Sequence, residues 1–180
     1  PPLKDATDRW ERAHDEPDPP GKPSWSSFQR MNDYARWMKR KGFYVLSYFN
    51  VSEYGRNMQY PAPPRKAASE ADLWKDPHDF LFQTKLANAL LYEPEDHRPG
   101  SSPKPYWTCY SAFVVDAGDP AYQEFMLEQA RRHIERLPDA AGICIDRLDW
   151  TRFYNPRRDD GVSWVNDRPA RSLQVSWRNL

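Results

Sequence analysis

Three short runs of apolar residues constrain the fold of this 180-residue chain more than any other feature. They span residues 43–49, 112–115 and 140–145, and polar or charged residues follow each of them closely. Each run is too short for a core helix and is rich in apolar, mainly aromatic or branched, side chains, which favours a β-strand. Because the runs are almost continuously apolar, they predict strands of a parallel sheet that is covered on both faces.

Two helices accompany the predicted strands. The first begins at Ser26 or Ser27, either of which can cap it, keeps its apolar residues at helical spacing, and ends at Gly42. The second covers residues 121–137, and Asp119 is its expected N-cap. Its buried face is expected to hold Phe125, Leu127, Ala130, Ile134 and Leu137, whereas Gln129 and His133 are expected to face water.

The order helix, strand, long loop, strand, helix, strand predicts an α/β fold built from parallel βαβ units. Eighteen prolines favour long loops, whereas eight Trp, ten Tyr and eight Phe favour a folded core. We expect an irregular, proline-rich arm over residues 1–25 and one domain over residues 26–180, with a long inserted loop over residues 55–106. The remaining expectations are a short helix at 80–91, a polar loop at 147–167 and the start of a helix at 169–180.

The charge balance and the mean hydropathy argue against nucleic-acid and membrane partners. Because 26 Lys and Arg residues balance 26 Asp and Glu residues, no nucleic-acid partner is expected. The mean hydropathy is −0.96, and no apolar run approaches the about 18 residues of a membrane helix, so no membrane partner is expected. No signal-peptide pattern opens the chain, but a removed signal would place it outside the cytoplasm, so the localisation stays open. Cys109 and Cys144 fit either a disulfide or two buried thiols.

Polar residues follow each predicted strand, which is where functional groups gather in parallel α/β folds. Asp146 closes the third strand and is the strongest catalytic candidate, as a nucleophile or an electrostatic stabiliser, because a carboxylate that ends an apolar strand is partly desolvated. The alternative is that Asp146 only caps a turn. The ends of the first two strands supply the candidate substrate-binding residues Asn50, Glu53 and Asp116, whereas Arg147, Asp149 and Trp150 follow Asp146 directly.

Two further candidates, Tyr154 and Trp164, lie among Asp and Asn residues in the polar loop. Sugars offer hydroxyls to polar side chains and C–H faces to aromatic rings, so this composition favours a carbohydrate subsite. Glu53 fits a salt bridge or a loop cap as well as an acid/base role. The chain has no glycine-rich nucleotide loop, no nucleophile elbow and no zinc-ligand spacing, so neither a cofactor nor a metal is expected.

Three segments, GFYVLSYFNVSEYG, DAGDPAYQEFMLEQARRHIERL and AGICIDRLDW, resemble the central strands of (β/α)8-barrel glycoside hydrolases, most nearly the α-galactosidase-like and dextranase-like enzymes. In that group the Asp that ends such a strand is commonly the catalytic nucleophile, and this role falls on Asp146. The resemblance also implies that Arg147, Asp149 and Trp150 contact the substrate or support the site. The resemblance covers residues 26–55 and 107–150. It implies a partial TIM barrel, because a full barrel takes about 250 residues and only three strands are predicted.

The resemblance therefore implies a glycoside hydrolase-like domain that acts on a carbohydrate. Its acid/base comes either from a later strand of a larger protein or, within this chain, from Glu53, Asp116 or Asp149. Retention of configuration would place the two carboxyl groups about 5–5.5 Å apart. Two other hypotheses stay open: a non-catalytic carbohydrate-binding or structural half-barrel, and a fragment or subunit that completes its barrel with strands from elsewhere.

Overall fold

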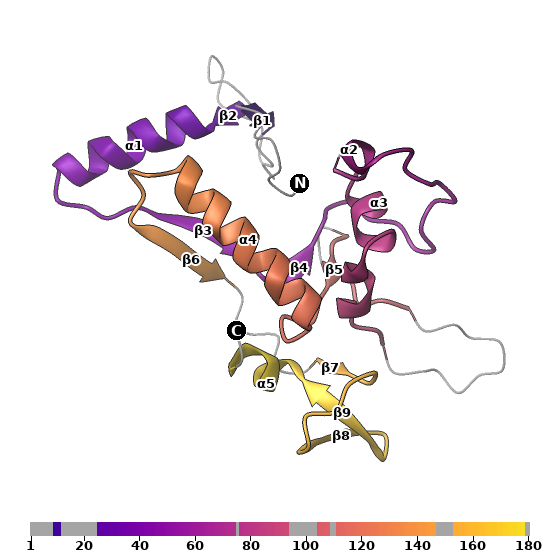
Figure 1. The fold of residues 1–180 in the computed structure, drawn as a ribbon. Helices are drawn as coiled ribbons and strands as arrows, with labels where there is room; N and C mark the ends of the chain where they lie inside the picture. Colours follow the sequence, from indigo (N-terminus) through magenta and orange to yellow (C-terminus); the bar gives the residue numbers. More distant parts are fainter. Residues whose placement is uncertain are drawn as a thin grey trace. The chain divides into compact units, whose positions relative to one another are not determined.

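The computed structural model describes residues 9–11, 25–74, 76–93, 104–108, 111–146 and 153–178 (Figure 1). The chain divides into two compact units: a larger unit of residues 50–127 and 145–180, and a smaller unit of residues 3–49 and 128–144. The fold is mixed α/β. The strands of the described residues form four separate sheets of two or three strands, and none closes into a barrel. The expected α/β class is confirmed at this level, together with one parallel pair of strands.

The smaller unit begins with a short antiparallel pair and a helix. Strand β1 (Arg9–Glu11) lies within the predicted irregular arm and pairs with β2 (Trp25–Ser27). Helix α1 (Phe28–Arg40) confirms the first predicted helix. Its end is closed by two hydrogen bonds, from Gly42 N to Lys39 O (3.0 Å) and from Phe43 N to Met38 O (3.1 Å). Gly42 has a φ of 84°, which explains why a glycine ends this helix.

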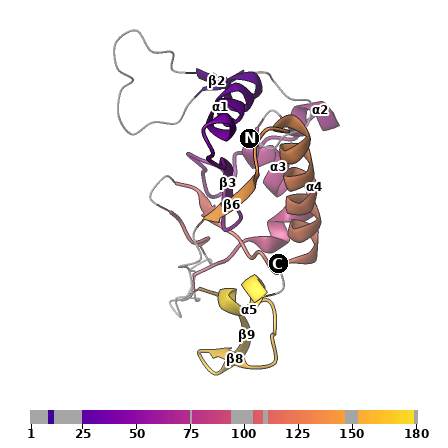
Figure 2. The same ribbon diagram turned by 90° about the vertical axis from the view of Figure 1, so that its left-hand side faces the viewer.

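The parallel pair consists of β3 (Leu46–Asn50) and β6 (Gly142–Asp146). The two strands lie side by side in both views (Figures 1 and 2). Just before them, the N–H of Ala141 donates to the carbonyl of Val45 over 2.8 Å. The first and third predicted strands therefore exist and are neighbours, as a βαβ unit requires.

The prediction that β3 is covered on both faces is wrong. The apolar run at 43–49 becomes a strand only from Leu46 onward, and Tyr44 before it is 81% exposed. Within β3, Leu46 and Tyr48 are exposed whereas Ser47 is buried. One face of the strand is thus covered and the other is open, so the apolar composition does not reflect burial on two sides.

Helix α4 (Pro120–Arg136) confirms the second predicted helix and its cap. The carboxylate of Asp119 accepts from the N–H groups of Ala121 (3.1 Å) and Tyr122 (3.3 Å). The predicted buried face is partly wrong, because Leu127 and Ile134 are exposed. The buried positions follow a different helical stripe that contains Tyr122, Met126, Gln129 and Leu137.

The second predicted strand belongs to an antiparallel pair, which corrects the expectation of an all-parallel sheet. Strand β5 (Phe113–Val114) pairs with β4 (Glu53–Tyr54) in the larger unit. A core of Leu91, Val114 and Leu173 forms beside it, and Tyr106 and Phe153 pack against this core. After β3 the chain thus enters another short strand, β4, instead of starting a crossover helix.

The long loop carries its own short helices: α2 (Glu70–Leu73), α3 (Pro77–Phe82) and a 3-10 helix, η1 (Lys85–Ala89). The last two replace the single helix expected at 80–91. Arg65 fastens the loop, because its guanidinium lies 2.7 Å from Asp76 and 2.8 Å from the buried Asp79. Burial raises the pKa of Asp76, but hydrogen bonds from Arg65 and from backbone N–H groups lower it overall.

The segment after residue 152 forms a small sheet and not a polar loop. Strands β7 (Tyr154–Asn155), β9 (Arg168–Ser172) and β8 (Ser163–Val165) pair antiparallel in that spatial order. Asn166 and Asp167 have positive φ angles of 51° and 60°, as the two-residue turn between β8 and β9 requires. The C-terminal helix, α5 (Leu173–Arg178), begins only after this hairpin.

Candidate functional site at the ends of the parallel strands

Asn50 and Asp146 are the last residues of the two parallel strands. The strands start together, because the N–H of Ala141 donates to the carbonyl of Val45 directly before them, and each strand is five residues long. Two strands that start together and run parallel also end together, so Asn50 and Asp146 close neighbouring strands at the same edge. The side chain of Asp146, and the candidates Arg147, Asp149 and Trp150, lie outside the described residues.

The Asn50 side chain organises the turn that follows β3. Its Oδ1 accepts from the N–H groups of Ser52 and Glu53, each over 3.0 Å, and its Nδ2 donates to Glu53 Oε2 over 2.7 Å. Ser52 is fully buried within this turn. Asn50 therefore holds both the backbone and one carboxylate oxygen of Glu53 in place.

The second carboxylate oxygen of Glu53, Oε1, is shielded from solvent and has no hydrogen-bond partner among the described residues. Leaving a buried polar atom unpaired costs roughly 1–3 kcal/mol, so such atoms are few in folded proteins and call for an explanation. Glu53 thus combines one anchored oxygen with one oxygen that lacks a protein donor.

Asp116 lies in a different environment from the open rim expected for it. It is 1% exposed, and its Oδ1 accepts from Gly118 N (2.9 Å) and from Ser176 Oγ (2.5 Å). Its Oδ2 accepts from Asn155 Nδ2 over 2.8 Å. A Cβ atom at Gly118 would lie 2.6 Å from Ser176 Oγ, so glycine is needed for this close approach. All of these contacts are internal, which makes Asp116 a buried junction of the larger unit.

A second buried carboxylate joins the same region. Asp119, besides capping α4, accepts from Arg158 Nη2 over 2.9 Å, and Arg171 donates to the Gly118 carbonyl over 2.8 Å. These contacts link the C-terminal sheet to the loop between β5 and α4. None of these residues except Asp116 was expected from the sequence to have a site role.

The two aromatic candidates have contrasting surroundings. Tyr154 is partly buried and pairs with Ser172 across β7 and β9. Trp164 is 64% exposed on β8, opposite Pro169. The turn before it is held by Asp160, whose carboxylate accepts from the N–H groups of Val162 (3.0 Å) and Ser163 (2.7 Å). Trp164 is therefore presented to solvent from a braced hairpin.

His133 is not solvated as expected. Its Nε2 lies 2.5 Å from Ser47 Oγ on β3, and its ring meets Phe49 edge-on at 5.9 Å. Burial lowers the pKa of His133, so the neutral ring is favoured. A small, mainly apolar depression lies beside it, but its other lining residues do not titrate. The stripe that carries Met126 and Gln129 also carries His133, and this spacing was the signal for its burial.

The Tyr54 hydroxyl is a second unpaired polar group in the larger unit. It is buried, has no hydrogen-bond partner among the described residues, and lies on the strand residue next to Glu53. Burial raises the pKa of Tyr54 strongly, and the nearby Tyr122 and Asp76 add to this effect. Because neighbouring strand residues point to opposite faces, Tyr54 and Glu53 do not share one site.

Cys144 is free and exposed, so it is neither bridged nor buried, whereas Cys109 lies outside the described residues. Within the described ranges, no cluster of three or more His, Cys, Asp or Glu side chains is arranged to hold a metal ion. None of the described helices has the length and apolar character needed to cross a membrane. Comparisons of this chain with family models, with curated proteins and with solved structures found no match.

Proposed function

We propose that this chain supplies part of the active site of a glycoside hydrolase, with Asp146 as the nucleophile and Glu53 as the acid/base. The observation that carries the proposal is the pair of parallel strands that end on Asn50 and Asp146, beside a Glu53 carboxyl that Asn50 orients and that keeps one unpaired oxygen. Of the candidates for the acid/base, Asp116 is disfavoured because protein donors occupy both of its oxygens.

The reaction has two balanced steps. The Asp146 carboxylate attacks the anomeric carbon while the bond to the leaving oxygen breaks, and the Glu53 carboxyl gives its proton to that oxygen. Water then attacks the anomeric carbon of the glycosyl ester, Glu53 takes the proton of the water, and Asp146 leaves as a carboxylate. In both steps Asn50 acts as a positioning residue, through its 2.7 Å hydrogen bond to Glu53 Oε2.

Hydrolysis of a panel of aryl and unsubstituted oligosaccharide glycosides tests this proposal. We expect Asp146→Asn to reduce every hydrolysis to background. We expect Glu53→Gln to slow oligosaccharide hydrolysis by roughly 10²–10⁴-fold but aryl glycoside hydrolysis much less, because an aryl leaving group departs without a proton. Asp167→Asn, in the exposed turn before β9, is the matched control and should retain activity. Turnover that survives Asp146→Asn, or no turnover by the unmodified chain, contradicts the proposal.

One observation favours the second hypothesis, a non-catalytic carbohydrate-binding protein. Trp164 offers an exposed ring on a braced hairpin, and such a ring can stack on a sugar face without any chemistry. Binding on a glycan array with no turnover, lost in Trp164→Ala, would support this function over hydrolysis.

Another observation favours a larger assembly. The open face of β3 exposes Leu46 by 54% and Tyr48 by 60%, whereas parallel sheets are normally covered on both faces. Further parallel strands, on another chain or on another part of a larger barrel, would cover this face. Native mass spectrometry tests this, since a single species at 21.2 kDa with no companion would contradict it.

A further inference from the structure

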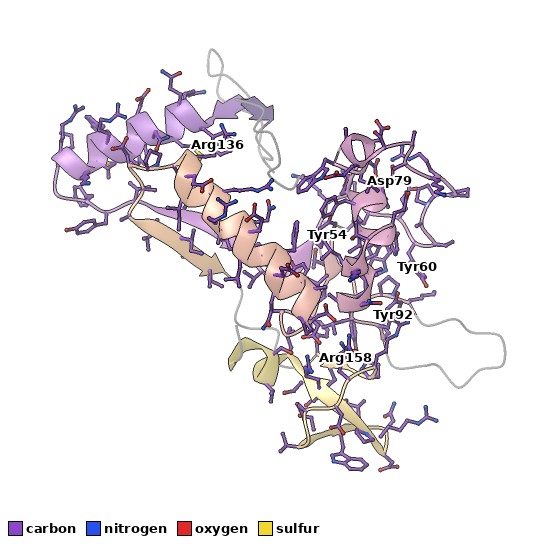
Figure 3. The ribbon with its side chains drawn as sticks, viewed as in Figure 1. Tyr54, Tyr60, Asp79, Tyr92, Arg136 and Arg158 are labelled. Atoms are coloured by element: carbon purple, nitrogen blue, oxygen red, sulfur yellow. The ribbon has the colours of Figure 1, made fainter. Side chains whose placement is uncertain are left out.

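We propose that Tyr60, Tyr92 and Arg157 form a binding site for a sugar residue that carries a carboxylate. The three side chains come from the loop after β4, from the segment after η1 and from the turn after β7, all within the larger unit; Figure 3 labels the two tyrosines. The choice of a sugar rests on the proposed function. The choice of a carboxylate rests on the contacts below.

Arg157 provides an exposed cation with no acidic partner in the described part of the chain. Its guanidinium lies 4.2 Å from the centroid of the Tyr92 ring. The two nearest carboxylates in sequence are engaged elsewhere, because Asp159 accepts from Gly161 N and Asp160 accepts from the N–H groups and hydroxyl of the β8–β9 hairpin. A guanidinium stacked on a ring keeps donors at its edge, and their planar fork matches a carboxylate.

Tyr60 provides an aromatic surface next to Tyr92, the ring on which Arg157 stacks. Tyr60 is 37% exposed, and its ring meets Tyr92 edge-on, with centroids 6.3 Å apart. Behind it, Phe82 lies 6.5 Å away and in turn packs on the fully buried Phe113 at 5.9 Å. The ring is therefore backed by aromatic side chains that reach the core. A pyranose that places its C–H face on Tyr60 would bring a carboxylate substituent toward Arg157.

The site is also held in place before any ligand arrives. Asn155, which is 1% exposed, accepts from the N–H of Arg157 at its Oδ1 (3.0 Å) and donates from its Nδ2 to the buried Asp116 (2.8 Å). The turn that carries Arg157 is thus tied to the buried junction around Asp116. A preorganised cation loses less conformational entropy on binding, which favours recognition over simple surface packing.

Calorimetric titration of the whole chain tests the inference with two matched ligands. The ligands are a galacturonic acid trimer and the same trimer after reduction of its carboxyl groups to alcohols. We expect the acidic trimer to bind at least about tenfold more tightly than the reduced trimer, and we expect added salt to weaken this preference. The comparison uses the unmodified chain, so it does not depend on any variant folding.

Variants then assign the preference to residues. Arg157→Gln should abolish it, Arg157→Lys should retain part of it because the charge stays but the planar fork is lost, and Tyr60→Ala should weaken both ligands equally. Arg136→Gln, which removes an exposed arginine at the end of α4, is the matched control and should keep the full preference. Circular dichroism confirms that each variant is folded.

Three results would overturn the inference: equal affinity for the two trimers, no binding of the acidic trimer, or a preference that persists in Arg157→Gln. Its failure is distinguishable from that of the proposed function. Carboxylate-dependent binding without hydrolysis contradicts the hydrolase and keeps this site. Hydrolysis of neutral glycosides without any carboxylate preference contradicts this binding site and keeps the hydrolase.

Discussion

Asp116 accepts hydrogen bonds at both of its carboxylate oxygens, whereas Glu53 accepts one at Oε2 and, from the described residues, none at Oε1. Both follow a strand and are acidic, so the sequence alone gives them the same expected role. The difference comes from residues far along the chain, since Asn155 and Ser176 meet Asp116 from 39 and 60 positions away. Local sequence holds no information on such partners, and for this reason the sequence could not rank these two candidates.

We expect Asp116→Ala to lower the free energy of unfolding by about 3 kcal/mol, because it leaves several buried donors without an acceptor. Urea unfolding followed by tryptophan fluorescence measures this change. Asp167→Asn, in an exposed turn, should stay within about 0.5 kcal/mol of the unmodified chain. An equally small effect of Asp116→Ala would show that the buried junction does not stabilise the fold.

His133 should make the stability depend on pH. Burial lowers the pKa of the folded His133 below its unfolded value of about 6.5, so the unfolded state binds the proton more strongly. Its contribution is therefore complete above pH 6.5 and is lost as the pH falls from there toward the folded pKa. Because the ring is only half-buried, the slope of the unfolding free energy against pH should be a fraction of the roughly 1.4 kcal/mol per pH unit that one proton gives.

The unfolding free energies of the unmodified chain and of His133→Gln, measured between pH 5 and pH 8, isolate this effect from the other titrating groups. The difference between the two proteins should shrink as the pH falls. Parallel curves would mean that His133 titrates alike in the folded and unfolded states.

Helices α1 and α4 could be predicted from the sequence because caps and apolar spacing are local signals. Gly42 and Asp119 both act as expected, at a helix end and a helix start. Strand direction is not a local property, so β5 could be recognised as a strand but not as the antiparallel partner of β4. The β8–β9 hairpin was missed because its strands are short and one contains Pro169, although the Asn166-Asp167 turn was a usable signal.

The β8–β9 hairpin should depend on Asp160. Desolvation raises the pKa of Asp160, but hydrogen bonds from the backbone of Ser172, Val162 and Ser163 lower it by more than desolvation raises it. The ionised form of Asp160 is therefore the one that stabilises the hairpin. We expect Asp160→Ala to speed amide hydrogen exchange at Val162, Ser163 and Ser172 by about tenfold or more. Asp159→Ala, which removes a single bond to Gly161, should affect that amide alone.

At the scale of the whole molecule, the described residues combine a parallel pair with two antiparallel pairs and a three-stranded antiparallel sheet. Its parallel pair has five residues in each strand, far less than a self-sufficient sheet, and Leu46 and Tyr48 leave one face of β3 uncovered. An uncovered apolar face promotes association with other surfaces. The partial barrel implied by the resemblance stays a prediction, because the described strands form separate small sheets.

We therefore expect the double variant Leu46→Thr, Tyr48→Thr to self-associate less than the unmodified chain while its melting temperature changes by only a few degrees, because both side chains are already exposed. Light scattering across a concentration series and thermal unfolding measure the two effects. Ser47→Val, on the covered face beside His133, is the contrasting variant and should lower the melting temperature without changing self-association. A large loss of stability in the double variant would mean that this face is covered.

The hydrogen bonds from Ser176 to Asp116, from Asn155 to Asp116, and from Arg157 to Asn155 form a relay from the C-terminal helix to a surface cation. A selection for altered ligand preference should consequently recover changes at Ser176, a residue with no solvent contact at all. A substitution at this buried position would then change both the stability of the fold and the choice of ligand.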